Sequence, residues 1–296
     1  MLPVRDQNPL IRGAYLPLPA ASAAPEGFSY TAGLEWSNTV NLERTAQERL
    51  LIDEETAELD LTAAWSSARW RLQATLPVIS RGGGVLDGFI DDWHRWLGLS
   101  NGARPLRPRN AYAIAYQHAG GPLRSTPAGT ALGDLALEGG RQLLDGERLG
   151  LTAWLGLEAP TGDRARLSGD GALDVATWLS GEYALGRRWQ LSARAGLSHP
   201  GGDTALPLAH TLRFGTLALA WRASAALEAI GQLDAHSPVA RSSSLEFLGR
   251  AVTLTIGGRY RRASGSVVEA GVVEDVEVGH SPDVTLHFGW RFAPVR

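Results

Sequence analysis

The sequence contains no cysteine and no lysine, and both absences exclude functions. Without cysteine the chain has no disulfide framework, no thiol nucleophile and no thiolate metal site. All of its basic side chains are arginine, and the formal net charge of −3 provides no field that would attract nucleic acid. We therefore expect neither a nucleic-acid partner nor a cysteine-based site.

Long apolar runs are missing as well. The most apolar stretch, "FGTLALAW" (residues 214–221), is much shorter than the roughly 18 residues of a membrane-spanning helix. This excludes a helical membrane protein, but it does not exclude a transmembrane barrel, whose strands alternate. The start, "MLPVRDQNP", lacks the apolar core of a signal peptide. We expect an exported protein from which a signal peptide has been removed.

The chain is instead rich in alternating apolar and polar residues. In "YTAGLEWSNTV", Leu34 and Trp36 fall on one face and Glu35 on the other, with Asn38 as a polar exception on the apolar face. A period of two is typical of strands that expose two different faces. The same period predicts strands near residues 28–40, 55–66, 69–78, 131–143, 148–158, 172–183, 188–198, 209–221, 225–234, 251–261, 267–276 and 282–292.

Two architectures fit this alternation. A soluble sandwich would bury the apolar faces, whereas a membrane barrel would turn them to lipid and its charged faces to the lumen. The aromatic residues favour the barrel, because they lie beside short connections, where a membrane barrel places its interfacial rings. Examples are Trp65 and Trp70 around "SSAR", Tyr183 and Trp189 around "ALGRR", Trp221 before "RASA", and Tyr260 before "RRASGS".

The predicted fold is therefore all-β, an antiparallel transmembrane barrel of about twelve strands forming one domain over residues 1–296. Residues 1–26 form an irregular N-terminal segment that can fold into the lumen. An even strand number makes residues 79–130 a long outer loop. The stretch "NAYAIAYQH" (residues 110–118) alternates like a strand, but counting it as spanning would break parity, so we assign it to this loop.

One helix is predicted inside the long loop, over residues 84–98. Its apolar residues recur at helical spacing. The parity argument puts the helix at the outer mouth, where it can cap the lumen, fold into it, or lie on the outer leaflet. We interpret it as a gating helix, whose apolar residues are Leu86, Phe89, Ile90, Trp93 and Trp96.

The same helix carries the candidate catalytic residues Asp91, Asp92 and His94. A histidine beside carboxylates can act as a general base, and carboxylates can hold calcium. The simpler interpretation, which we favour, is a solvated polar face behind a packed apolar one. No nucleotide-binding, zinc-protease or other cofactor motif is present, so we expect no metal and no cofactor.

Charged residues of the strands are predicted to line the lumen. Each would be costly to bury unless it is paired. They form either a salt-bridged filling, which we favour, or the lining of a permeation path. The predicted lumen-lining residues are Glu35, Glu58, Asp60, Arg71, Arg194, Glu228, Arg259, His287 and Arg291.

Several stretches resemble a known family. "DQNPL", "LEWSN", "LDGFIDDWHRWLGLSNGAR", "ALGDLAL" and the closing "LHFGWRF" are similar to a proteobacterial family of uncharacterised outer-membrane proteins, domain of unknown function 3187. The helix motif is the most specific part, while "ALGDLAL" and "APTGD" also occur in outer-membrane families linked to uptake of hydrophobic compounds. The resemblance implies export and a barrel in the outer membrane of a Gram-negative bacterium, and it supplies no catalytic residue.

The leading functional hypothesis is a passive channel or carrier for small apolar molecules. The alternative is an outer-membrane lipid hydrolase that uses His94 as base, with Asp91 or Asp92 orienting it or holding calcium. A third alternative is a purely structural barrel. The expected partners are outer-membrane lipid, a small hydrophobic solute and the machinery that inserts barrels.

Overall fold

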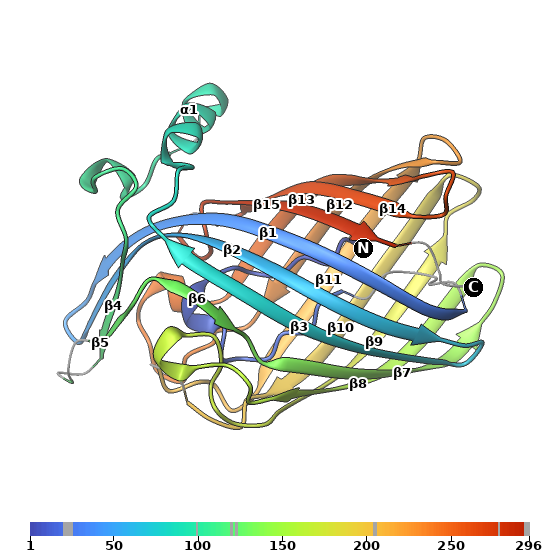
Figure 1. The fold of residues 1–296 in the computed structure, drawn as a ribbon, viewed down its shortest axis with the longest axis horizontal. Coiled ribbons are helices and arrows are strands. Elements are labelled where there is room, and N and C mark those ends of the chain that lie inside the picture. The colour runs from blue at the N-terminus through green and yellow to red at the C-terminus, as the bar shows by residue number, and fades with distance from the viewer. Residues whose placement is uncertain are drawn as a thin grey trace.

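The computed structural model describes residues 1–19, 26–98, 100–118, 121, 124–203, 206–277 and 279–292. Within this part of the chain one sheet of fifteen strands forms. Two short strands, β4 (Ala113–His118) and β5 (Arg124–Thr126), extend from β2 beyond the ring (Figure 1). A third, β6 (Gly129–Leu132), pairs with the end of β3 beside β7, and the other twelve strands close the ring. Antiparallel pairing of β1 with both β2 and β15 completes the closure.

The twelve strands of the ring match the twelve predicted from the sequence. They are β1 (Gly27–Arg44), β2 (Glu48–Ser66), β3 (Trp70–Gly82), β7 (Leu135–Asp145), β8 (Leu149–Ala159), β9 (Asp174–Ala184), β10 (Trp189–His199), β11 (Leu212–Arg222), β12 (Leu227–His236), β13 (Ala251–Arg261), β14 (Val267–Asp275) and β15 (Val284–Arg291).

The two faces of the wall have the polarity predicted for a membrane barrel. Leu155, Leu217 and Ile256 face outward and are 50%, 50% and 66% exposed, whereas the inward-facing Glu58 and His287 are both 0% exposed. A water-soluble sandwich would show the opposite distribution, with its apolar rows buried. Among the described helices, none is long and apolar enough to cross a membrane.

The two ends of the barrel differ in their connections. Short turns join the strands at one end, here called the turn end, whereas the connections spanning residues 83–134, 160–173, 200–211, 237–250 and 276–283 lie at the other, here called the loop end. Exposed aromatic residues gather at the turn end, as predicted, because Trp and Tyr favour the interface of a membrane. They include Phe28, Trp70, Tyr183, Trp189, Trp221, Tyr260, Trp290 and Phe292.

The structure changes three boundaries at the loop end. The predicted loop between residues 40 and 55 is strand, because β1 and β2 continue their pairing as far as Arg44 and Arg49. The stretch assigned to the outer loop as strand-like forms β4, which pairs with β2 beyond the ring. The helix predicted over residues 84–98 is α1 (Asp87–Leu97), which ends at Gly98 in the left-handed conformation that favours glycine.

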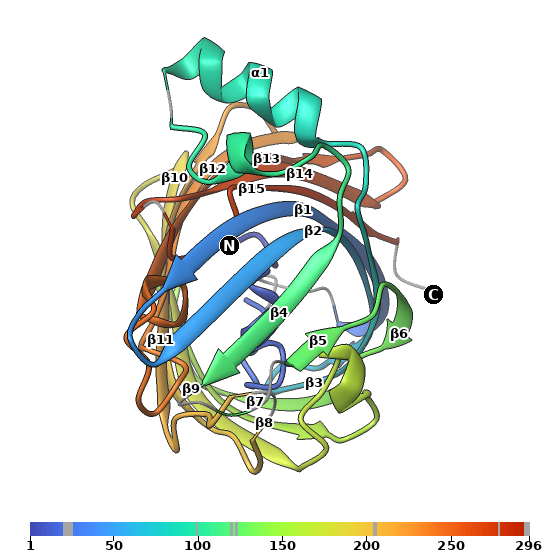
Figure 2. The same cartoon turned by 90° about the vertical axis from the view of Figure 1, so that its left-hand side faces the viewer.

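Short 3-10 turns complete the described elements. They are η1 (Pro9–Ile11), η2 (Arg104–Leu106), η3 (Arg164–Arg166) and η4 (Glu246–Leu248). η1 lies in the N-terminal segment inside the ring, and the other three belong to connections at the loop end (Figures 1 and 2).

Candidate functional site

Residues 1–19, here called the luminal segment, run inside the barrel (Figure 2). The segment contacts widely separated strands: the amide of Leu2 donates to Gln232 Oε1 at 2.8 Å, and Asn8 Nδ2 donates to the carbonyl of Phe247 at 2.7 Å. In the described part of the chain, its backbone–backbone hydrogen bonds stay within the segment, as from Ile11 to Asn8. Its contacts with the wall therefore involve side chains, and its removal would leave the strand ladders intact.

A cluster of inward carboxylates holds the luminal segment. Arg5 Nη2 lies 3.1 Å from Glu58 Oε1 and 2.8 Å from Asp60 Oδ1, and its amide donates to Glu35 Oε1 at 3.2 Å. Arg12 forms a second ion pair with Glu58. Buried charges are tolerated only when they are paired, so these two arginines compensate a wall that would otherwise be acidic at this point.

Two predicted lumen-lining arginines belong to the wall and donate hydrogen bonds to the luminal segment. Arg194 Nη1 donates to the carbonyl of Pro17 at 2.5 Å, and Arg259 Nη2 donates to the carbonyl of Met1 at 2.9 Å. Arg259 also donates from Nε to Glu269 Oε1 at 2.6 Å. Charged groups on both partners therefore fix the path of the segment.

The remaining predicted lumen-lining residues lie close to this network. Glu228 is 3.5 Å from Arg259, and Arg291 is 3.9 Å from Glu269. His287 is fully buried, with Nδ1 3.9 Å from Glu35 Oε1. Arg71 lines a small cavity in the lumen together with Arg291.

Sequence reasoning missed an aromatic cluster on the inner face of the wall. Trp154 and Trp178 stack with ring centroids 5.5 Å apart, and Phe214 packs edge-on against Trp178 at 6.2 Å. Tyr15 of the luminal segment belongs to the same cluster. The signal was available, because Trp154 falls between Ala153 and Leu155 on the inward face of its strand.

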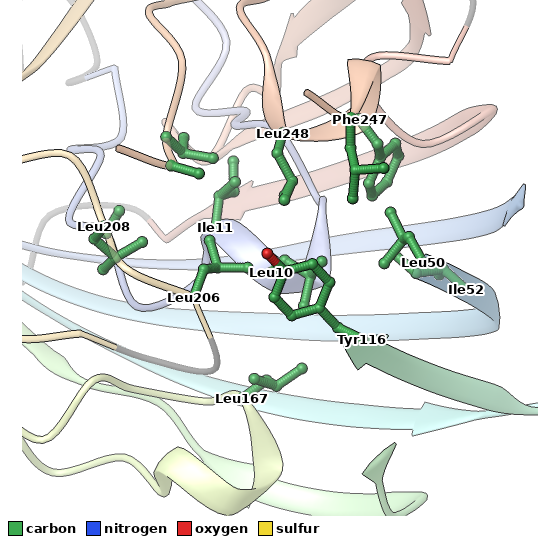
Figure 3. Packing of buried hydrophobic residues seen from close by; sticks show 14 of the residues in the cluster. Leu10, Ile11, Leu50, Ile52, Tyr116, Leu167, Leu206, Leu208, Phe247 and Leu248 are labelled. Atoms are coloured by element: carbon green, nitrogen blue, oxygen red, sulfur yellow. The ribbon is translucent and has the colours of Figure 1, made fainter. Parts of the chain in front are cut away.

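The mouth at the loop end is closed by an apolar cluster that was also missed (Figure 3). The outer part of the β1–β2 hairpin, residues 40–53, and β4 cross the opening and are here called the lid (Figure 2). Inward-facing residues of the lid pack against the luminal segment and the opposite loops. The mouth cluster contains Leu10, Ile11, Leu50, Ile52, Tyr116, Leu167, Leu206, Leu208, Phe247 and Leu248.

Two glutamates fasten the lid to the loop of residues 237–250. Glu43 accepts hydrogen bonds from the amides of Glu246 and Phe247 at 2.6 and 3.0 Å. Glu48 accepts from the amide of Ser244 at 2.8 Å and from the hydroxyl of Tyr116 at 2.9 Å. The lid is thus attached by side-chain contacts, as the luminal segment is.

Two small cavities lie beside the luminal segment. Pro3, Leu18, Arg71 and Trp154 help to line a cavity of about 80 Å³. A second cavity of about 30 Å³ touches Leu16 and shares no lining residue with the first. An apolar cavity that holds benzene has a volume of about 150 Å³. Neither cavity would hold a solute of that size unless the luminal segment moved, whereas a larger space of about 290 Å³ lies at the turn end beside Glu228 and Arg259.

The helix does not lie over the mouth, which corrects its interpretation as a gate. Leu86, Ile90 and Trp93 pack against Val284 and other outward residues of the wall. The predicted gating residues Phe89 and Trp96 are 50% and 76% exposed. The physical reason lies in a polar residue on the apolar face: Asn38 accepts from Arg104 Nη1 at 2.6 Å and donates to Asp87 at 3.0 Å, which anchors the region to the outer wall.

The candidate catalytic residues are not brought together. His94 Nδ1 lies 3.0 Å from Asn101 Oδ1, and Asp92 pairs with Arg95 at 2.6 Å. Asp91 accepts from Arg104 and Arg109; burial raises the pKa of its carboxyl, but hydrogen bonds and the charges of these two arginines outweigh burial and lower it. The charge of Asp91 is thus already paired with two arginines, and within the described residues its hydrogen bonds go to them and not to His94.

A metal site was not expected from the sequence. In the described ranges no group of three or more histidine, aspartate and glutamate side chains is arranged to hold a metal ion. Two carboxylates of the lumen, Glu58 and Asp60, are paired with Arg5 and Arg12.

One solved structure of an outer-membrane protein shares the fold. The COG4313 outer membrane channel from Pseudomonas putida F1 has 12% sequence identity and a TM-score of 0.59, over 91% of this chain and 96% of that one. The Ralstonia pickettii toluene transporter TbuX has 9% identity and a TM-score of 0.47, over 92% and 90% of the two chains. No curated protein matches the sequence. A family described as "Protein of unknown function (DUF3187)" matches residues 1–293, and the chain belongs to this family.

Proposed function

We propose that the chain is an outer-membrane channel for small apolar molecules, and that this structure is its closed state. The loop end would face outward and the turn end the periplasm, as in barrels with short periplasmic turns. The protein from Pseudomonas putida F1 that shares the fold is an outer membrane channel. The proposal rests mainly on one observation: a segment that pairs with no strand of the ring fills the lumen.

The way in which the lumen is filled supports a channel more than a structural barrel. A permanent core would be expected to consist of apolar packing, because buried ion pairs contribute little net stability. Here the luminal segment packs some apolar side chains against the wall, such as Leu2 and Leu10. The two also meet through ion pairs such as Arg5–Asp60 and through hydrogen bonds to carbonyl groups, as from Arg194 to Pro17. These polar contacts can be replaced by water when the segment moves, and no strand pairing has to break.

The apolar character of the solute is inferred from two patches along the lumen. The mouth cluster offers leucine, isoleucine and phenylalanine side chains at the loop end. Deeper inside, Trp154, Trp178 and Phe214 form the aromatic cluster beside the luminal segment. Aromatic faces bind apolar and aromatic solutes through dispersion and stacking. A solute could therefore exchange contacts with the lid for contacts with these rings.

The test is the rate at which an apolar probe crosses the outer membrane of intact cells. N-phenyl-1-naphthylamine becomes fluorescent when it reaches an apolar environment, and nitrocefin, hydrolysed by a periplasmic β-lactamase, reports the entry of a polar, charged solute. We expect cells that produce the chain to take up the apolar probe faster than cells with an empty vector, with nitrocefin entry unchanged.

Two results would contradict the proposal. If cells that produce the chain took up the apolar probe no faster than cells with an empty vector, the chain would be a structural barrel and not a channel. A parallel rise in nitrocefin entry would indicate a general leak instead of a channel for apolar molecules. The variant Arg95→Ala is a suitable control, because that side chain lies on the outside of the barrel and is 68% exposed.

A further inference from the structure

Val85 and Leu86, the helix α1 and the turn η2, here together called the foot, present an apolar surface that the barrel does not use. Val85 and Trp96 are 71% and 76% exposed, and Phe89 is 50% exposed. Residues 89 and 96 are seven apart, so they lie on the same flank of the helix. Their rings adjoin Trp93, with centroids 6.2 Å from Phe89 and 5.7 Å from Trp96.

This surface is continuous with the face of the wall that meets lipid. Trp93 and Ile90 pack on the outward residues Trp36 and Leu286, and Trp93 Nε1 donates to Glu274 Oε1 at 3.1 Å. Figure 1 shows α1 standing outside the ring at the loop end. The exposed flank therefore extends the apolar outer surface of the barrel sideways.

The foot is held rigidly. Arg104 has a side chain only 4% exposed, and it donates to Asp87 at 2.7 Å, to Asp91 at 3.2 Å and to Asp283 at 3.0 Å. Asp87 also accepts from the amide of Asn110 at 2.6 Å. A surface fixed in this way has a defined orientation, unlike the exposed apolar residues of a mobile loop.

The distribution of aromatic residues identifies the occupant. The exposed aromatic side chains of the wall lie mainly toward the turn end, including Trp70, Trp189 and Trp221. At the loop end, within the part of the chain that the structure describes, the exposed aromatic side chains are Phe89 and Trp96. A membrane barrel has an aromatic belt at each of its two interfaces. The foot supplies the residues that the wall lacks at this end.

We propose that the foot inserts Val85, Phe89 and Trp96 into the outer leaflet of the membrane that holds the barrel. The exposed Arg95 and Asp92, paired at 2.6 Å, would then lie among the lipid headgroups. Amphipathic helices bind an interface in this way, with aromatic and apolar residues below and charged residues above. The inference requires a barrel in a membrane, but it does not depend on transport.

The absence of cysteine makes a direct test simple, because single cysteines can be introduced without removing any. Nitroxide labels would be attached to Phe89→Cys, Trp96→Cys and Arg95→Cys in lipid nanodiscs. Leu155→Cys, on the outward face of β8, serves as a lipid-exposed reference. Power saturation with oxygen and with a water-soluble nickel complex then measures whether each label lies in lipid or in water.

We expect the ratio of oxygen to nickel accessibility at positions 89 and 96 to be as high as at the lipid-exposed position 155. At position 95 we expect a low ratio, as for a label in water. Equal nickel accessibility at 89, 95 and 96 would overturn the proposal. Dipolar broadening between labels on different chains would also overturn it, because a second copy would then cover the surface. A heat-modifiable band on gels shows that each variant is folded, and the Leu155→Cys label shows separately that the barrel lies in lipid.

Discussion

The barrel wall and the luminal segment touch along the whole lumen, yet different interactions hold them. Strands of the wall pair through continuous backbone ladders, as between β1 and β2 from Gly27 to Arg44. The luminal segment is attached by side chains, with Arg5 and Arg12 among Glu35, Glu58 and Asp60. A ladder is a cooperative unit, whereas side-chain contacts can be lost locally. The wall can therefore persist while its filling moves.

The strongest test of this difference removes the arginines of the segment. In Arg5→Ala/Arg12→Ala, Glu58 and Asp60 lose their positive partners, and breaking a buried pair costs about 3–5 kcal/mol. We expect the luminal segment to leave its site and the lumen to conduct, with a preference for cations because the exposed cluster is acidic. Single-channel recordings under a salt gradient measure both the conductance and the reversal potential.

The matched control is Arg222→Ala/Arg250→Ala, because these side chains are 52% and 70% exposed. It should remain as closed as the parent protein. A double variant of Arg5 and Arg12 that stays closed while folding normally would show that the segment is a permanent core.

A second test compares neighbouring residues of one strand, Trp154 on the inner face and Leu155 on the outer. Trp154→Ala leaves a cavity beside the luminal segment and should reduce the free energy of unfolding by about 3–5 kcal/mol. Leu155→Ala loses only the transfer of its methyl and methylene groups, about 2 kcal/mol, because lipid fills the space. Urea unfolding in lipid vesicles gives both values, and an equal loss would contradict a packed lumen.

The wall was predictable from the sequence because its signal is local. Each strand alternates with a period of two, so Leu34, Glu35 and Trp36 report their faces without knowledge of any partner. The beginning of β2 carries a further local pattern. Leu50 and Ile52 have the same parity as Glu58, so an apolar surface at the mouth follows from continuing the alternation.

The filling was not predictable in the same way. Residues 1–19 have no steady period, and the pairing of Arg5 with Asp60 depends on the closed ring. The position of the foot is equally non-local, because it depends on Arg104 reaching Asn38 across 66 residues. Asn38 nevertheless gave a hint, since a polar side chain on a lipid-facing row needs a partner to cover it.

A third test addresses the lid, which is attached like the luminal segment but at the mouth. Glu48→Gln keeps the shape of the side chain but removes the charge that strengthens its bonds to Ser244 and Tyr116. Hydrogen bonds to charged groups contribute about 1.5–3 kcal/mol each. We expect faster amide hydrogen exchange in residues 113–118 and 239–248, with unchanged exchange in β8 to β12. The control Glu147→Gln, at an exposed turn, should leave the exchange rates of all these segments unchanged. A uniform increase across the barrel in Glu48→Gln would mean that the lid and the wall open together.

The smallest expected effect is that of pH on the attachment of the foot to the barrel. Like the luminal segment, the foot is held by an arginine, Arg104, that contacts several carboxylates. Burial raises the pKa of Asp91, but Arg109 and Arg104 outweigh it, so the pKa lies below that of an unfolded chain. The resulting stabilisation is present above the ordinary pKa of about 4 and is lost as pH falls through the lowered value. We therefore expect a nitroxide at position 96 to become more mobile in strong acid.

Asp283 also forms an ion pair with Arg104, but its pKa is shifted in the opposite direction from that of Asp91. Burial raises the pKa of the Asp283 carboxyl in spite of the arginine. Protonation of Asp283 therefore relieves a burial penalty, and the mobility change should be modest. In Asp91→Asn the acid-dependent increase should disappear, since the group that loses its charge is gone. If that variant retained the full increase, another carboxylate would control the attachment, and the analogy between the foot and the luminal segment would fail at Asp91.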